Sequence, residues 1–134
     1  MARAALALAA VALAAIGAGA AAAQDTANGE AIYSRCAACH ALAYDRTGPR
    51  HCGLIGRRAG SLPGFDYSEA MKRSRLTWDA KTLDRFLADP MKAVPGTSMG
   101  YAGVKDSKER ADLIAWLREA GSAASAECRN RPGR

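Results

Sequence analysis

Residues 36–40 constrain this chain more than any other feature, because Cys36, Cys39 and His40 form a C-x-x-C-H motif around two alanines. The pattern is typical of covalent attachment of a c-type haem. Two thiols three residues apart at a helix end can each add to one vinyl group of a porphyrin, and the next residue can project its imidazole toward the iron. The motif therefore predicts a fold built around one covalently bound haem.

Three other uses of these cysteines have less support. A redox-active C-x-x-C requires a thioredoxin-like βαβ context, which the sequence does not contain. A zinc-binding module using Cys36, Cys39, His51 and Cys52 would need an unusual ligand spacing. A plain disulfide between Cys36 and Cys39 would leave His40 without a role. Haem attachment explains all three residues of the motif.

The first 23 residues have the composition of an export signal. They contain 14 alanines and one charge, Arg3, and they end in small residues up to Ala23 before the polar Gln24. This pattern predicts a signal peptide over residues 1–23 that is cleaved near Ala23, and a periplasmic protein. The alternative is a retained membrane anchor, because residues 4–23 carry no charge and are just long enough to span a bilayer.

The composition of the mature chain fits a small domain that gains from a large apolar ligand. Cleavage leaves 111 residues with 18 Lys and Arg against 13 Asp and Glu, a net charge of +5 that favours acidic partners. Export argues against nucleic acid as that partner. Only eight residues are aromatic, and a chain of this length buries a modest core, so a buried cofactor would add to its stability.

Apolar spacing predicts an all-α domain with long loops and no strands. The predicted helices run from Thr26 to Cys36, from Tyr67 to Arg73, from an N-cap at Thr77 to Pro90, and from Asp106 or Ser107 to Gly121. Glycine and proline indicate loops between them, and a polar tail follows. Gly29 costs its helix about 1 kcal/mol relative to alanine, so we expect another backbone to approach there.

A second axial ligand to the iron must come from elsewhere in the chain. Met71, Met91, Met99 and His51 are the candidates. We favour Met99, because its loop of proline and glycine can aim the sulfur at a fixed point, whereas the default role of the other methionines is to fill the core. With both axial positions filled, the iron has no open site for substrate. We therefore expect one-electron transfer and no enzyme activity, with a haem peroxidase or ligand sensor with a labile sixth ligand as the alternative.

The motifs, in their order, resemble the class I cytochrome c family of small soluble electron carriers. The resemblance covers about residues 29–120. The matching segments are Gly29–Tyr33, Cys36–His40, Thr47–Pro49, Gly53–Arg57, Gly64–Tyr67, Leu76–Trp78, Pro95–Met99, Ala102–Val104 and Asp112–Leu117. The resemblance implies the cytochrome c fold over residues 24–121, with three main helices, short helices and long loops wrapped around one haem c.

The resemblance also implies roles for individual residues at the haem. Cys36 and Cys39 would form the thioether bonds, and His40 and Met99 would be the axial ligands. Pro49 would offer its carbonyl to the other ring nitrogen of His40, which fixes the tautomer. Three further residues would hydrogen-bond the haem propionates: Arg57, Tyr67 and Trp78.

The expected partners are redox protein complexes, to which the chain would dock as a monomer. The resemblance implies a cytochrome bc-type complex as donor and an oxidase or a photosynthetic reaction centre as acceptor. Positive charge around the haem edge would steer these encounters. Arg35, Lys92 and Lys105 are the candidates by position.

The chain departs from the family pattern at three positions. His51 and Cys52 stand where the family commonly has a haem-packing leucine and a variable residue, and Phe86 stands where many relatives have tyrosine. We interpret His51 as a local loop residue, since the axial pair is already filled. Cys52 and Cys128 remain, and in an exported chain they most simply pair, tying the tail of residues 122–134 to the loop after His40. Free thiols or an intermolecular bond are the alternatives.

Overall fold

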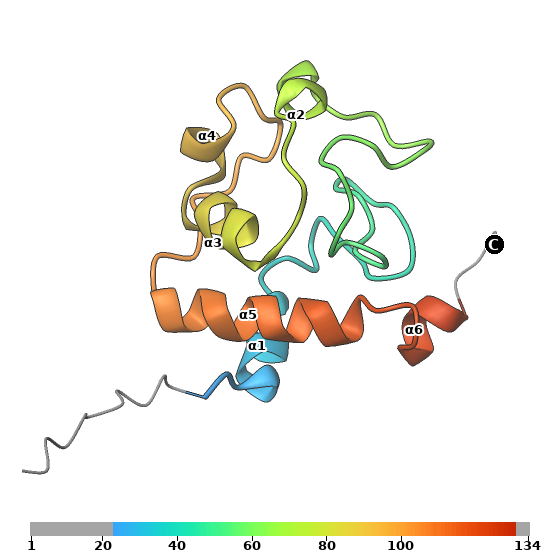
Figure 1. Cartoon of the computed structure of the whole chain (residues 1–134), viewed down its shortest axis with the longest axis vertical. Helices are drawn as coiled ribbons and strands as arrows, with labels where there is room; N and C mark the ends of the chain where they lie inside the picture. Colours follow the sequence, from blue (N-terminus) through green and yellow to red (C-terminus); the bar gives the residue numbers. More distant parts are fainter. Residues whose placement is uncertain (1–22, 131–134) are drawn as a thin grey trace, which may run out of the picture.

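The computed structural model describes residues 23–130, so residues 1–22, which hold nearly all of the predicted signal peptide or anchor, lie outside it. The described part contains α1 (Thr26–Tyr33), α2 (Glu69–Arg73), α3 (Ala80–Ala88), α4 (Pro90–Ala93), α5 (Ser107–Ala120) and α6 (Ala126–Arg129) (Figure 1). The β-structure of this described part is one isolated antiparallel β-bridge between Arg58 and Thr77. Within residues 23–130, no helix is both long enough and apolar enough to cross a membrane. The all-α prediction is confirmed.

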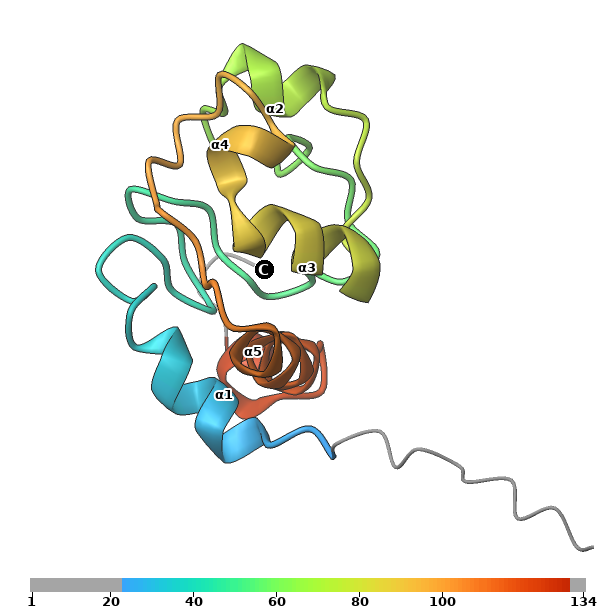
Figure 2. The ribbon, with the colours of Figure 1, turned by 90° about the vertical axis from the view of Figure 1, so that its left-hand side faces the viewer.

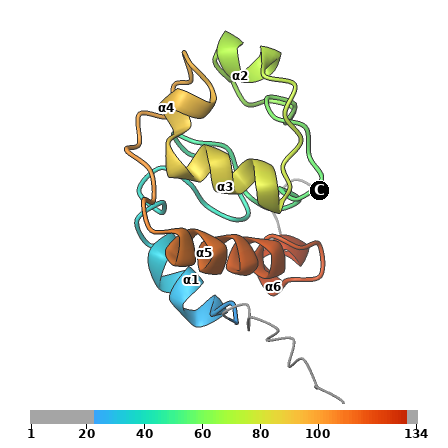
Figure 3. The ribbon, with the colours of Figure 1, turned by 60° about the vertical axis from the view of Figure 1, so that its left-hand side comes forward.

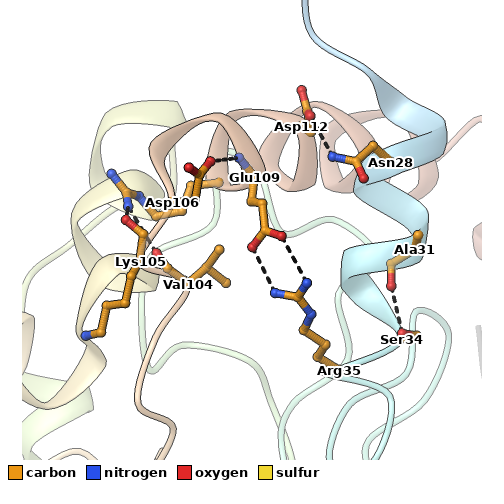
Figure 4. Close-up of polar contacts among 10 residues, drawn as sticks. Asn28, Ala31, Ser34, Arg35, Val104, Lys105, Asp106, Glu109 and Asp112 are labelled. Carbon is orange, nitrogen blue, oxygen red and sulfur yellow. Dashed lines mark hydrogen bonds and ion pairs between the residues drawn. The ribbon is translucent and has the colours of Figure 1, made fainter.

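Helices α1 and α5 pack against each other at the base of the molecule (Figures 1 and 3). A side chain at Gly29 would overlap the backbone carbonyl of Asp112 on α5, so this glycine permits the close approach that we expected. The fully buried Asp112 carboxylate accepts hydrogen bonds from the Asn28 side chain at 2.9 Å (Figure 4), from the Asp25 amide at 2.8 Å and from the Lys108 ammonium at 2.6 Å. These bonds, that from Asp25 foremost, lower the pKa of Asp112 to about 2.

Helix α3 lies above α5 and contributes a stripe of buried Leu83, Phe86 and Leu87 (Figure 3). The predicted N-cap at Thr77 is wrong. Asp79 caps α3, because its carboxylate accepts the amide of Thr82 while the Thr82 hydroxyl accepts the amide of Asp79. This reciprocal pair satisfies two amide donors at the start of the helix, which Thr77 alone would not do.

Proline and serine begin two short helices that apolar spacing did not indicate. Pro90 ends α3 as predicted, but it also opens α4, where the missing amide of a proline costs nothing. Ser125 caps α6 within the predicted polar tail, its hydroxyl accepting the amide of Cys128. Both helices have four residues, too few for an apolar period to show.

Two long loop segments complete the domain. Residues 34–68 connect α1 to α2, and residues 94–106 connect α4 to α5. Figure 2, with α5 seen nearly end-on, shows α1 beside α5 and the loops and short helices arranged above them. The loops and helices together enclose the space in which the candidate site lies.

Candidate haem site

A mostly apolar cavity of about 320 Å³ lies between the helices and the two long loops. Cys36, Cys39 and His40 line it from the turns that follow α1, and Met99 lines it from the loop between α4 and α5. The structure therefore brings the four predicted attachment and axial residues to one cavity. Five residues of the cavity lining are exposed: Arg35, Cys39, Thr47, Ser98 and Gly100. They belong to two segments, residues 35–47 and residues 98–100, and the cavity opens to solvent between these segments.

The imidazole of His40 is oriented by its loop. Its Nδ1 lies 2.8 Å from the carbonyl oxygen of Pro49, which can only accept, so Nδ1 carries the proton and donates it. This leaves the lone pair of Nε2 for a metal ion. Burial lowers the pKa of His40, which keeps the ring neutral near pH 7. A side chain at Gly48 would overlap the ring, so only glycine fits there.

Neither of the two motif cysteines takes part in a disulfide, so a bond between Cys36 and Cys39 is not formed. Cys36 is half-buried and Cys39 is exposed, and burial raises the pKa of the Cys36 thiol. The alternative zinc site is contradicted, because Cys52 is bonded to Cys128 and residues 23–130 contain no cluster of His, Cys, Asp or Glu that could hold a metal ion. A porphyrin brings four nitrogen ligands of its own, so an iron held by haem does not require such a cluster.

The three methionines of the mature chain have different surroundings. Met99 is half-buried at the cavity, and Met71 on α2 is buried at the same cavity. Met91 on α4 is 58% exposed and lies outside the lining, so the prediction that it fills the core is wrong.

The three predicted propionate partners also line the cavity. Trp78 is buried and packs on Phe86, with ring centroids 5.0 Å apart. Tyr67 is half-buried, and burial raises its pKa while the neighbouring Arg57 lowers it. The guanidinium of Arg57 donates to the backbone carbonyls of Cys52 (3.1 Å) and Arg50 (2.9 Å). These two bonds to the loop backbone hold the charged guanidinium of Arg57 in place.

Arg50 adjoins this region without lining the cavity itself, and sequence reasoning did not single it out. Its guanidinium forms an ion pair with Asp45 at 2.8 Å. Burial raises the pKa of Tyr67, and the charges of Arg57 and Arg50 oppose part of that rise. The buried Nε of Arg50 has no hydrogen-bond partner. A buried donor without a partner is costly, so a nearby anionic oxygen would stabilise this arrangement. The carboxylates of a haem fit that requirement.

His51 is likewise more than the local loop residue that we predicted. Its ring stacks on that of His40, with centroids 4.4 Å apart and planes inclined by 23°. Its Nδ1 lies 3.2 Å from the hydroxyl oxygen of Tyr33. No sequence signal pairs these residues, because the contacts depend on the path of the loop.

Cys52 and Cys128 are bonded to each other in the structure, with their Cα atoms 5.5 Å apart. Both are buried. Beside the disulfide, the amide of Gly53 donates to the carbonyl of Gly121 at 2.8 Å. The loop after His40 is therefore fastened to the end of α5 and to α6.

The three candidate docking cations differ in how they are held. Arg35 forms a two-pronged ion pair with Glu109, at 2.8 and 3.0 Å (Figure 4). The Lys105 ammonium donates to the carbonyl of Ala88 at 2.9 Å. Lys92 is exposed on α4. Because Glu109 compensates its charge, Arg35 presents less net positive charge at the surface than its position suggested.

Comparison with known proteins identifies what this arrangement is similar to. The family model for cytochrome c matches residues 26–121. The chain is 46% identical over 99 residues to a cytochrome c2 of Rhodomicrobium vannielii, covering 72% of this chain and 79% of that protein. It is 46% identical over 101 residues to a cytochrome c2 of Rhodoplanes tepidamans, covering 73% and 94%.

A solved structure agrees with the sequence relatives. Cytochrome cH from Methylobacterium extorquens superposes with a TM-score of 0.69 at 43% identity, covering 71% of this chain and 98% of that one. The part of the chain that the family model matches includes the C-x-x-C-H turn and the Met99 loop, since both lie within residues 26–121.

Proposed function

Since this chain belongs to the cytochrome c family and is an electron-transfer protein with one covalently bound haem c, we propose which of its residues hold the haem and how they serve electron exchange. Cys36 and Cys39 form the two thioether bonds. His40 and Met99 are the axial ligands of the iron. When bound, the haem supplies a one-electron couple.

The observation that carries this proposal is the convergence of the four residues on one cavity, with His40 already oriented by Pro49. Because His40 and Met99 would both hold the iron, a substrate would find no open position there. A thioether sulfur and an apolar pocket favour the ferrous state and so raise the reduction potential. The chain provides a rigid ligand set and a low-dielectric surrounding, which is what an electron carrier needs.

Arg57, Tyr67 and Trp78 hold the propionates in this proposal. Their support is that all three line the cavity, and that two arginines act on the phenol of Tyr67. Arg50 extends this set from outside the cavity lining, because its buried Nε has no hydrogen-bond partner in the protein. An anion next to these cations would be stabilised far more than in water.

The mature protein works in the periplasm, after loss of residues 1–23, as a monomer that shuttles between redox complexes. A cytochrome bc-type complex is the donor, and an oxidase or reaction centre is the acceptor. The support is the signal-like first segment, the disulfide between buried Cys52 and Cys128, and the positive charge of the mature chain.

A Met99→Ala variant tests the axial assignment. We expect the oxidised variant to lose the weak long-wavelength sulfur-to-iron absorption band, and the reduced variant to bind carbon monoxide rapidly, because the sixth position is then open. Met91→Ala is the matched control, since this methionine is exposed and outside the cavity. An unchanged band in Met99→Ala would contradict the assignment and move it to Met71. Rapid carbon monoxide binding by the unaltered protein would favour a ligand sensor or peroxidase.

A further inference from the structure

A second histidine lies directly against the proposed axial ligand and has no part in the proposed function. The ring of His51 is nearly parallel to that of His40, with planes inclined by 23° and centroids 4.4 Å apart. A flat contact of this kind is favourable between aromatic rings. Residue 51 therefore presents a flat ring face to His40, which an aliphatic side chain at this position would not do.

The ring of His51 is itself held in orientation from α1. The Tyr33 hydroxyl and the Nδ1 of His51 are 3.2 Å apart, and the two rings meet edge to face with centroids 5.7 Å apart. Tyr33 is buried and also packs on Trp116 of α5, at a centroid distance of 4.4 Å. The hydrogen bond thus connects the loop histidine to the packed pair of helices α1 and α5.

The backbone of His51 is fixed as well. Its amide lies 3.1 Å from the carbonyl of Ala41, and the next residue, Cys52, is bonded to Cys128 of α6. At the end of α5, a side chain on Gly121 would come within 2.8 Å of the His51 carbonyl oxygen, so the two backbones are in close contact. His51 cannot shift without moving α5 or α6.

The other contacts of His40 leave one freedom of its ring. The bond from Nδ1 to Pro49 fixes one edge of the imidazole, and a tilt of the ring about that bond would leave the bond intact. Gly48 allows close approach and has no side chain to stop such a tilt. A second ring lying flat on the first opposes it.

We propose that His51, hydrogen-bonded to Tyr33 and stacked on His40, is a positioning residue that sets the plane of the proposed axial imidazole. This inference rests on the proposed ligation of the iron by His40. A leucine in place of His51 would fill similar space, but it could neither stack nor bond to Tyr33. The chain therefore gains an oriented ligand from its departure from the family pattern.

Proton NMR of the oxidised holoprotein tests the inference. The paramagnetically shifted resonances of the haem methyl groups depend on the direction of the axial imidazole plane, so they report orientation and not merely folding. We expect His51→Leu to change the order or spacing of these resonances. Tyr33→Phe should move them in the same direction and by less, since the stacked ring remains. Tyr44→Phe, at an exposed loop tyrosine, is the control and should leave the pattern unchanged.

A double variant separates a specific effect from a general loosening of the fold. With leucine at position 51, Tyr33→Phe should cause no further change, because the hydroxyl has lost its partner. An unchanged pattern in His51→Leu would overturn the positioning role, and so would an equal effect of Tyr33→Phe in both backgrounds. If His51→Leu fails to fold with haem, His51→Phe replaces it. A change of the haem methyl resonances in the same direction as in Tyr33→Phe then supports the inference. Unchanged methyl resonances in His51→Phe overturn it.

The same spectra distinguish failure of this inference from failure of the proposed function. If the unaltered oxidised protein lacks the upfield resonances of an iron-bound methionine and the low-spin methyl pattern, the axial ligation is wrong and the inference fails with it. If those resonances are present and His51→Leu does not change the methyl pattern, the ligation stands and only the positioning role is overturned.

Discussion

Reducing the bond between Cys52 and Cys128 should destabilise the protein without changing its fold. The bond joins residues 76 positions apart, and it connects the loop after His40 to α6. Thioether bonds resist thiol and phosphine reductants, so in the haem-loaded protein this is the one link that such reagents would cut. The perturbation therefore needs no mutation.

The expected loss follows from the length of the closed loop. In the chain-entropy model, a loop of this size restricts the unfolded state by about 4 kcal/mol, and native disulfides contribute about 2–4 kcal/mol in practice. The hydrogen bond from Gly53 to Gly121 and the close contact of Gly121 with His51 hold the same segments in the folded state. Because these contacts persist after reduction, the native structure should survive and the free energy of unfolding should fall by about 2–4 kcal/mol.

Guanidinium unfolding followed by tryptophan fluorescence is the assay. Trp78 lines the cavity, so a bound haem quenches it until the chain unfolds. Both samples are first brought to the ferrous state with ascorbate, because the reductant for the disulfide would otherwise also change the iron. The denaturant dependence should steepen on cleavage, since an uncrosslinked chain exposes more surface when unfolded. A Cys52→Ala, Cys128→Ala double variant should not respond to the reductant.

One result would refute this reasoning. If cleavage lowers the free energy of unfolding by less than about 1 kcal/mol and the denaturant dependence stays the same, the bond does not constrain the unfolded chain as the entropy model requires.

Three further predictions concern the contacts of α1, α5 and His40. Gly29→Ala should lower stability by about 1–3 kcal/mol in thermal unfolding, because overlap with α5 outweighs the ~1 kcal/mol gain in helix propensity; a stabilised variant would contradict the close approach. Because the pKa of Asp112 is lowered to about 2, the stabilisation by its carboxylate is complete above pH 3.8 and is lost as the pH falls toward about 2. Asp112→Asn should therefore flatten the dependence of stability on pH in that range, as measured by acid unfolding. An unchanged profile would contradict the hydrogen bonds from Asp25 and Lys108. Gly48→Ala should reduce haem incorporation, measured as absorbance per chain, because the added methyl overlaps His40, and normal incorporation would show that the ring can move aside.

The main helices could be predicted from the sequence because local patterns encode them. The wide apolar face of α5, its cap at Asp106 and its end at Gly121 all lie within one stretch of chain. The glycine at position 29 indicated a close backbone contact for the same reason, since its cost in a helix is local. The cap of α3 was harder, because both Thr77 and Asp79 are good capping residues and only the reciprocal bond with Thr82 decides between them.

The attachment motif could also be read locally, whereas its surroundings could not. Cys36, Cys39 and His40 are fixed by spacing alone. The stacking of His51 on His40 and its bond to Tyr33 arise from the course of a loop with no period, and the buried Nε of Arg50 is a property of tertiary packing. The short helix α4 was not predicted, because a proline can mark the end of one helix as well as the beginning of the next.

Mass spectrometry of the tryptic peptide of residues 36–46 tests the central claim most directly. Cleavage after Arg35 and Arg46 isolates both motif cysteines in one fragment. For protein purified from a host that matures c-type cytochromes, the account predicts one haem on this peptide and no alkylation at Cys36 or Cys39 after treatment with iodoacetamide. A peptide that carries two alkylated cysteines and no haem would contradict it.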